Sequence, residues 1–76
     1  MNKPRRAQLA ALSTRLEQIK SDLESVRDDE QSTFDQMPES FQGGERGQKA
    51  ENAVSFLDDA ISSLEEAVTS IESASE

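Results

Sequence analysis

The side chains of this sequence best suited to chemistry are carboxylates that recur every seven residues. Five of them lie near the end of the chain: Asp58, Asp59, Glu65, Glu66 and Glu72. A row of acids of this kind repels nucleic acid and attracts basic protein surfaces. The chemistry it predicts is binding to a protein. The alternative is an ordinary coiled-coil helix whose acids only keep it in solution.

The residues that most enzymes and metal sites need are missing. The chain has no histidine and no cysteine, so it lacks the common general base, thiolate ligands and the Glu-x-x-His pairs of di-metal helical bundles. The segment 43–47 lacks the lysine and hydroxyl residue of a phosphate-binding loop, and the acids of 28–39 lack calcium-loop spacing. We therefore expect no enzymatic activity, no catalytic residue, no metal site and no cofactor.

The charge is concentrated in the second part of the chain. The net charge is −8; residues 1–49 hold nine acids and eight bases, whereas residues 50–76 hold seven acids and no base. No apolar run approaches membrane-spanning length, and the basic start of the chain is not followed by a signal-peptide core. We expect one domain over 1–76, located in the cytoplasm and without a direct nucleic-acid or membrane partner.

A seven-residue repeat over 53–74 positions these acids. Val54, Ile61 and Val68 take heptad position a, and Leu57, Leu64 and Ile71 take position d, which predicts a coiled-coil helix over about 45–74. Position g is alanine four times, at Ala53, Ala60, Ala67 and Ala74. Alanine lets another backbone approach closely, so we expect this alanine strip to be the face on which the chain oligomerises.

A second amphipathic helix is predicted over about 5–36. Its a positions are Leu9, Leu16 and Leu23, and its d positions are Leu12, Ile19 and Val26. Pro38 ends this helix and Gly43-Gly44 is the strongest loop signal, so a loop is expected over about 37–44. Around it we expect one apolar cluster of Phe34, Met37, Phe41 and Phe56.

Opposite charges at position e predict how the two helices pair. Position e is mostly basic on the first helix and acidic on the second, and e faces e in an antiparallel pair. The expected neighbours are Arg6 with Glu72, Lys20 with Asp58 or Glu65, and Arg27 with Glu51. The fold class is therefore all-α, an antiparallel two-helix hairpin. Because such a hairpin buries little, we expect a homodimer that forms a four-helix bundle.

The central segment resembles a family of small uncharacterised proteins common in bacteriophages and prophages. Those proteins look like LE-x-I-x-x-EEQ-x-x-F-D-x-x-PE-x-x-Q-x-SERG followed by an acid-rich alanine heptad helix. The resemblance covers about residues 16–74 and departs slightly at Gly43-Gly44. The matching positions are Leu23, Glu24, Val26, Glu30, Gln31, Phe34, Asp35, Pro38, Glu39, Gln42, Glu45, Arg46 and Gly47. It implies a phage origin and no particular activity.

Three functions fit these features. The first is a non-enzymatic phage protein that binds and inhibits a host defence or nucleic-acid-processing protein through its acidic helix, for example by imitating nucleic-acid phosphates. The second is a structural, assembly or adaptor oligomer in phage replication or packaging, with the alanine strip and the loop cluster as contact surfaces. The third is a sponge for a nucleotide signal, whose phosphates would meet Arg5, Arg6, Arg15, Arg46 and Lys49.

Overall fold

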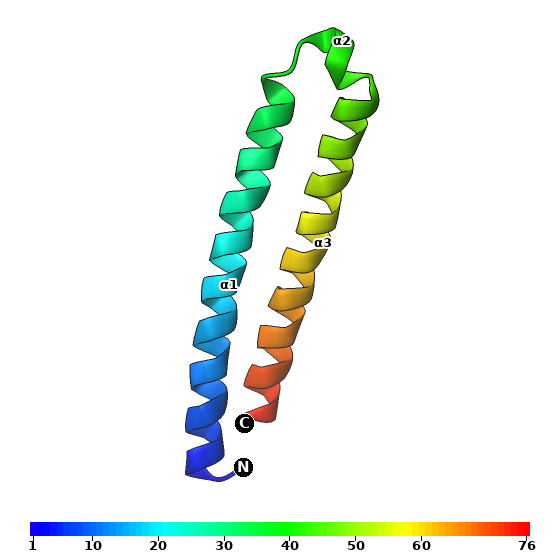
Figure 1. Cartoon of the computed structure of the whole chain (residues 1–76). Helices are drawn as coiled ribbons and strands as arrows, with labels where there is room; N and C mark the ends of the chain where they lie inside the picture. Colours follow the sequence, from blue (N-terminus) through cyan, green and yellow to red (C-terminus); the bar gives the residue numbers. More distant parts are fainter.

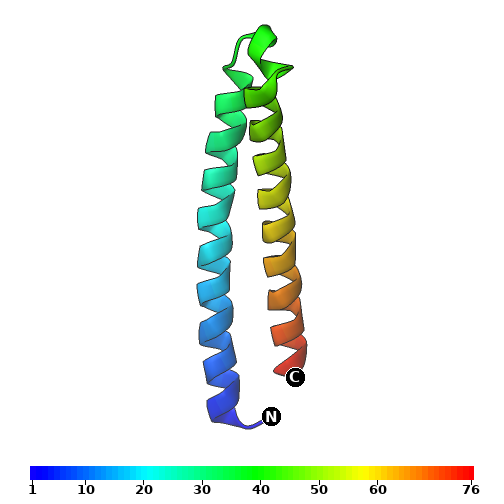
Figure 2. The same ribbon diagram turned by 45° about the vertical axis from the view of Figure 1, so that its right-hand side comes forward.

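The chain forms two long helices that pack against each other lengthwise. A computed structural model describes all residues 1–76. Helix α1 spans Lys3–Asp35, α2 is a short helix at Glu39–Gln42, and α3 spans Glu45–Ala74. Both views show α1 and α3 running in opposite directions with the two termini at one end (Figures 1 and 2). The Cα trace measures 58 × 15 × 11 Å, and the predicted all-α class is confirmed.

The ends of α1 follow from local chemistry. The Asn2 side chain accepts a hydrogen bond of 2.9 Å from the backbone N–H of Arg5, which satisfies one of the free donors at the helix start. Pro4 lies in the first turn, where its missing N–H is not needed. At the other end α1 stops at Asp35, three residues before Pro38, whose ring disfavours helical backbone in the residue before it.

The expected loop contains the short helix α2, and its turns do not depend on the Gly43-Gly44 pair that predicted it. We call residues 36–44 the elbow; α2 lies inside it, and its Phe41 and Gln42 amides donate to the carbonyl of Pro38 at 2.8 and 3.0 Å. Neither Gly43 nor Gly44 has a positive φ. Only a third glycine is required by space: a Cβ on Gly47 would lie 2.6 Å from the Cα of Gln42 and closer still to its carbonyl group.

Gln42 connects the elbow to both long helices. Its backbone lies against the buried Gly47 at the start of α3. Its side-chain amide donates a hydrogen bond of 3.1 Å to the carbonyl oxygen of Phe34 in the last turn of α1, which also accepts one of 3.1 Å from the backbone N–H of Met37. The elbow is therefore held on both sides by one residue.

The shared core is thin, and α1 is rotated relative to the predicted seam. Only Ala50, Val54 and Val68 are buried apolar residues, all on α3. On α1 the a residues are half-buried, but the d residues remain exposed: Leu12 by 43%, Ile19 by 48% and Val26 by 55%. The e residues Ser13, Lys20 and Arg27 are turned inward instead. The prediction of an a/d contact face on α1 is thus wrong; the face that meets α3 is a/e.

This rotation has a physical reason. Lys20 and Arg27 form ion pairs with acids of α3, and they reach these acids only when position e faces the partner helix. The alanines at position g of α3 are small enough to let the two backbones approach on that side.

None of the three helices combines the length and the apolar character that a membrane span requires.

Candidate protein-binding surface

The five predicted acids divide into two groups. Asp58 and Glu65 form ion pairs with bases of α1, whereas Asp59, Glu66 and Glu72 form none. All five are exposed. Of these five, the acids that remain free to meet another molecule are therefore Asp59, Glu66 and Glu72; Glu51, nearer the start of α3, is also exposed and unpaired.

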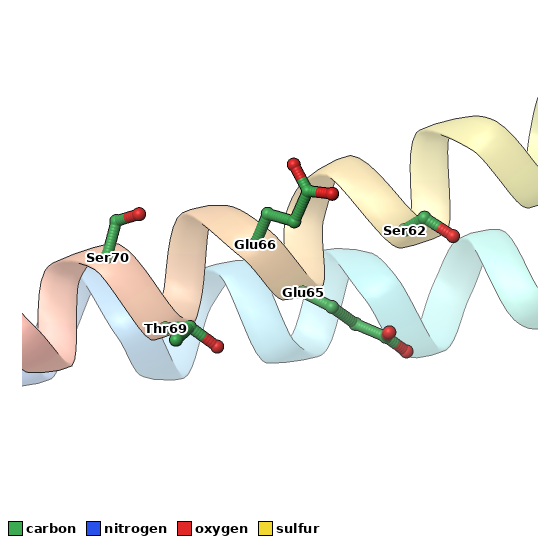
Figure 3. Close-up of a pocket in the computed structure, with 5 residues that line it drawn as sticks. All are labelled: Ser62, Glu65, Glu66, Thr69 and Ser70. Atoms are coloured by element: carbon green, nitrogen blue, oxygen red, sulfur yellow. The ribbon is translucent and has the colours of Figure 1, made fainter.

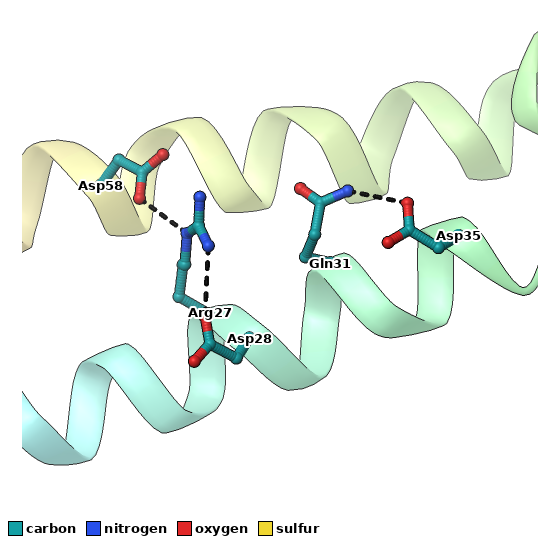
Figure 4. A network of polar contacts seen from close by, with 5 residues as sticks. All are labelled: Arg27, Asp28, Gln31, Asp35 and Asp58. Carbon is teal, nitrogen blue, oxygen red and sulfur yellow. Dashed lines mark hydrogen bonds and ion pairs between the residues drawn. The ribbon is translucent and has the colours of Figure 1, made fainter.

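The first ion-pair network joins the two helices between the middle of α1 and the elbow (Figure 4). The Nε of Arg27 donates to Asp58 across the helix pair at 2.8 Å, and its NH1 donates to Asp28 on the same helix at 3.1 Å. The hydrogen bonds to Asp58 and then to Asp28 raise the pKa of the Arg27 guanidinium above its ordinary value. One turn further along α1, the amide of Gln31 donates to Asp35 at 3.0 Å.

The second network is centred on Lys20. Its Nζ lies 3.5 Å from Glu17 on the same helix and 3.6 Å from Glu65 of α3. Burial of the side chain is the largest single influence and would lower the pKa of Lys20. The two carboxylates of Glu17 and Glu65 together outweigh it and raise this pKa above its ordinary 10.5. Of the two partners expected for Lys20, Asp58 and Glu65, the structure shows Glu65.

The other two expected pairs are wrong, and the register explains why. Lys20 and Arg27 are seven residues apart, and so are Glu65 and Asp58 in the reverse direction. Arg27 therefore meets Asp58 and not Glu51. The same step places Ser13 opposite Glu72, and one further step places Arg6 beyond the last turn of α3. Arg6 and Glu72 consequently form no ion pair.

The outer side of α3 carries a shallow polar hollow (Figure 3). It is lined by Ser62, Glu65, Glu66, Thr69 and Ser70, without an apolar residue. In the close-up Glu66 points away from α1 while Glu65 extends along it. Hydroxyl and carboxylate groups on an open helix surface can accept hydrogen bonds and attract cations, but they enclose no substrate. No three acids come together as ligands for a metal ion.

The predicted oligomer face and loop cluster are only partly exposed. Ala53, Ala60 and Ala67 are half-buried, and only Ala74 is exposed. At the elbow, Phe34 and Met37 are half-buried and Phe41 is 50% exposed. The guanidinium of Arg46 lies 6.0 Å from the ring centre of Phe41, a favourable cation–aromatic distance.

Phe56 does not join this cluster. It is 73% exposed, so the expected apolar cap on the elbow lacks its fourth member. Its heptad position c lies on the outer side of α3, away from the a and d residues that meet α1. A phenylalanine exposed to this degree adds apolar area to the surface rather than to the core.

Sequence reasoning also missed two groups of residues. One is the stripe of Leu12, Ile19 and Val26 on α1, which was placed inside the helix pair. The basic residues at position e were the available signal, because bases that reach acids on α3 must turn position d outward. The other group is Gln42 with Gly47, which the resemblance named as matching positions without indicating that they contact each other.

Comparison with known proteins adds no relative. No protein-family model matches the chain, and neither the curated proteins nor the solved structures contain a significant match.

Proposed function

We propose that this chain is a non-enzymatic binding protein whose α3 surface engages a basic surface on another protein. The observation that supports the proposal most directly is the set of unpaired acids Asp59, Glu66 and Glu72. They lie on a helix that contains no base after Lys49. Fixed like charges on a rigid helix raise the local potential and attract a surface of opposite sign.

The pairing within the molecule sharpens this proposal. Asp58 and Glu65 already neutralise two bases of α1, so they contribute less to binding than Asp59, Glu66 and Glu72. The latter three follow one side of α3 at steps of seven and six residues, which is about 10 Å per step at 1.5 Å per residue. A host nuclease or defence protein that binds nucleic-acid phosphates offers a basic groove of the complementary sign, and inhibition of such a protein is the proposed outcome.

The test is capture of partners from a bacterial host lysate with three forms of the chain. One is the wild type, and one carries Asp59→Asn, Glu66→Gln and Glu72→Gln. A control carries Glu24→Gln, Asp29→Asn and Glu39→Gln, which changes the net charge equally but lies outside α3. Each of these acids is free of ion pairs.

The proposal expects a protein that is captured by the wild type and by the control but is lost from the α3 variant. Its affinity should fall by roughly tenfold or more, and it should also fall with rising salt, because exposed charges are screened. A partner that is retained equally by all three forms would contradict the proposal.

A second function is favoured by a separate observation. The exposed apolar residues Leu12, Ile19 and Val26 form a stripe that an adaptor or assembly protein would use for contacts. In that case the bound partner would survive high salt, and a charge placed in the stripe would release it.

A further inference from the structure

The exposed face of α1 has no partner within the molecule. Leu12, Ile19 and Val26 are seven residues apart and between 43% and 55% exposed, so they form one straight stripe along the helix. A shallow, mostly apolar groove lies along it, lined by Leu12, Arg15, Leu16 and Ile19 of α1 and by Ile71 of α3. We propose that a second copy of this chain covers this stripe, with the two α1 helices antiparallel and Ile19 at the two-fold axis.

The charges of α1 favour the antiparallel arrangement. Residues 3–18 contain four bases and one acid, whereas residues 20–35 contain two bases and six acids. Two α1 helices side by side in the same direction would bring like charges together. In the antiparallel arrangement the basic half of each helix lies against the acidic half of the other. Each copy has one base and one acid next to the stripe, and in this arrangement each of them lies beside a residue of opposite charge in the other copy.

Those neighbours are Arg15 and Asp22, which occupy position g beside the stripe. In an antiparallel pair g faces g. With Ile19 on the axis, Arg15 of one copy lies beside Asp22 of the other, and the symmetry repeats the pair. Neither residue forms an ion pair within its own chain. The stripe is self-complementary in the same sense, because Leu12 meets Val26 of the second copy.

The alanines of α3 are compatible with the same axis. The register set by Lys20 with Glu65 places Ile19 level with Glu66, which is next to Ala67. A two-fold axis at that level also relates Ala60 of one copy to Ala74 of the other, so the small residues of the two α3 helices would face each other.

The size of the molecule and its thin apolar core also favour association with a second copy. The outline of the Cα trace, 58 by 15 Å, sets an upper limit on the face that a second copy can cover, and this limit is of the order of the roughly 800 Å² that each partner contributes to a standard interface. A chain with only three buried apolar residues gains much of its apolar burial by association, as is usual for domains of this size. The second copy is thus the occupant that the sequence itself supplies.

Single cysteines test the geometry, because the chain has no cysteine of its own. Ile19→Cys should form an intermolecular disulfide on mild oxidation, since a disulfide needs Cα atoms within about 7 Å. Leu12→Cys alone should not, but a mixture of Leu12→Cys and Val26→Cys chains should cross-link to each other. Ser21→Cys on the far side of α1 gives the background rate.

Two results would overturn the proposal. One is an Ile19→Cys yield no higher than that of Ser21→Cys, which would mean that the stripes do not meet. The other is efficient cross-linking of Leu12→Cys with itself, which would indicate a parallel pair.

Sedimentation measurements test the energetics. The wild type should have the mass of a dimer, Ile19→Glu that of a monomer, and the control Ser21→Glu that of a dimer. If Ile19→Glu also loses its helical circular dichroism, its monomeric mass could reflect unfolding, and exchange of the charges at Arg15 and Asp22 then tests the interface instead. Arg15→Asp or Asp22→Arg alone should weaken association by roughly tenfold, and both changes in one chain should restore it. A wild type that is monomeric at every concentration, or a double swap no better than the single changes, would contradict the proposal.

This inference does not rest on the proposed function, and the two can fail separately. A monomeric wild type would remove the dimer but leave the acids of α3 free to bind a protein. A dimer that captures its partner equally well after neutralisation of Asp59, Glu66 and Glu72 would remove the proposed function alone.

Discussion

Replacement of Gly47 by alanine should destabilise the protein, although helix propensity alone predicts the opposite. Gly47 is the third residue of α3, and a Gly→Ala change inside a helix ordinarily stabilises it by up to about 1 kcal/mol. Here the new methyl carbon would lie 2.6 Å from the Cα of Gln42 and would overlap its carbonyl group. Side-chain atoms at this distance must move, and the obstacle is backbone that cannot rotate away.

The change in the free energy of unfolding can be estimated from the contacts of Gln42 that the new methyl group would displace. Separating Gln42 from α3 introduces the strain of an overpacked site, about 1–3 kcal/mol. It also loosens the hydrogen bond of the Gln42 amide to Phe34, which contributes about 1 kcal/mol. After subtraction of the propensity gain, Gly47→Ala should lower the free energy of unfolding by about 2 kcal/mol. For a domain of this size the melting temperature should fall by roughly 10 °C.

Gly43→Ala is the matched control. Nothing lies within 4 Å of the position of its Cβ, and its φ of −82° suits any residue. Alanine there should be neutral or stabilising by up to about 1 kcal/mol, because it restricts the unfolded chain. Urea unfolding followed by circular dichroism, at one fixed protein concentration, measures both variants. The reasoning about the elbow is refuted if Gly47→Ala is as stable as Gly43→Ala.

Three further predictions concern the helix pair. Arg27→Glu should lower the melting temperature by placing a carboxylate beside Asp58; a second change Asp58→Arg should restore it and Glu51→Arg should not, which thermal unfolding can check. Because the pKa of Lys20 is raised above 10.5 in the folded chain, its contribution to stability is complete below about pH 10.5 and is lost as the pH rises through the folded value. Unfolding measured from pH 9 upward should therefore show no loss until about pH 10.5 and a loss above it, and Lys20→Arg should shift that loss to higher pH. Asn2→Ala should cost about 0.5–1 kcal/mol and Asn2→Asp almost nothing, measured by helicity and urea unfolding.

The sequence was sufficient for the helices and their direction because both depend on repeated patterns. Heptad spacing marks each helix over several turns, and the contrast of basic and acidic e positions narrowed the partner of Lys20 to Asp58 or Glu65. The rotation of α1 was missed because Leu12, Ile19 and Val26 fit a seam as well as an exposed stripe. Their periodicity is the same in both cases, and only the reach of the basic side chains distinguishes them.

The elbow was harder to predict for a different reason. Its geometry depends on one close approach between the Gln42 backbone and Gly47, and neither residue belongs to a repeated pattern. Gly43-Gly44 gives a stronger loop signal than Gly47, yet neither glycine uses a left-handed backbone. The acids of α3 were identified as exposed from their heptad positions, but the division into paired and unpaired groups required the register.

The elbow also fixes the order in which the chain can fold. Gln42 and Phe34 are eight residues apart, so their contact closes a short segment at little loss of chain entropy. Contacts between Lys20 and Glu65 close 45 residues unless the elbow has already formed. Folding should therefore nucleate at the elbow and extend turn by turn toward the termini, and the terminal turns should be the first to open under native conditions.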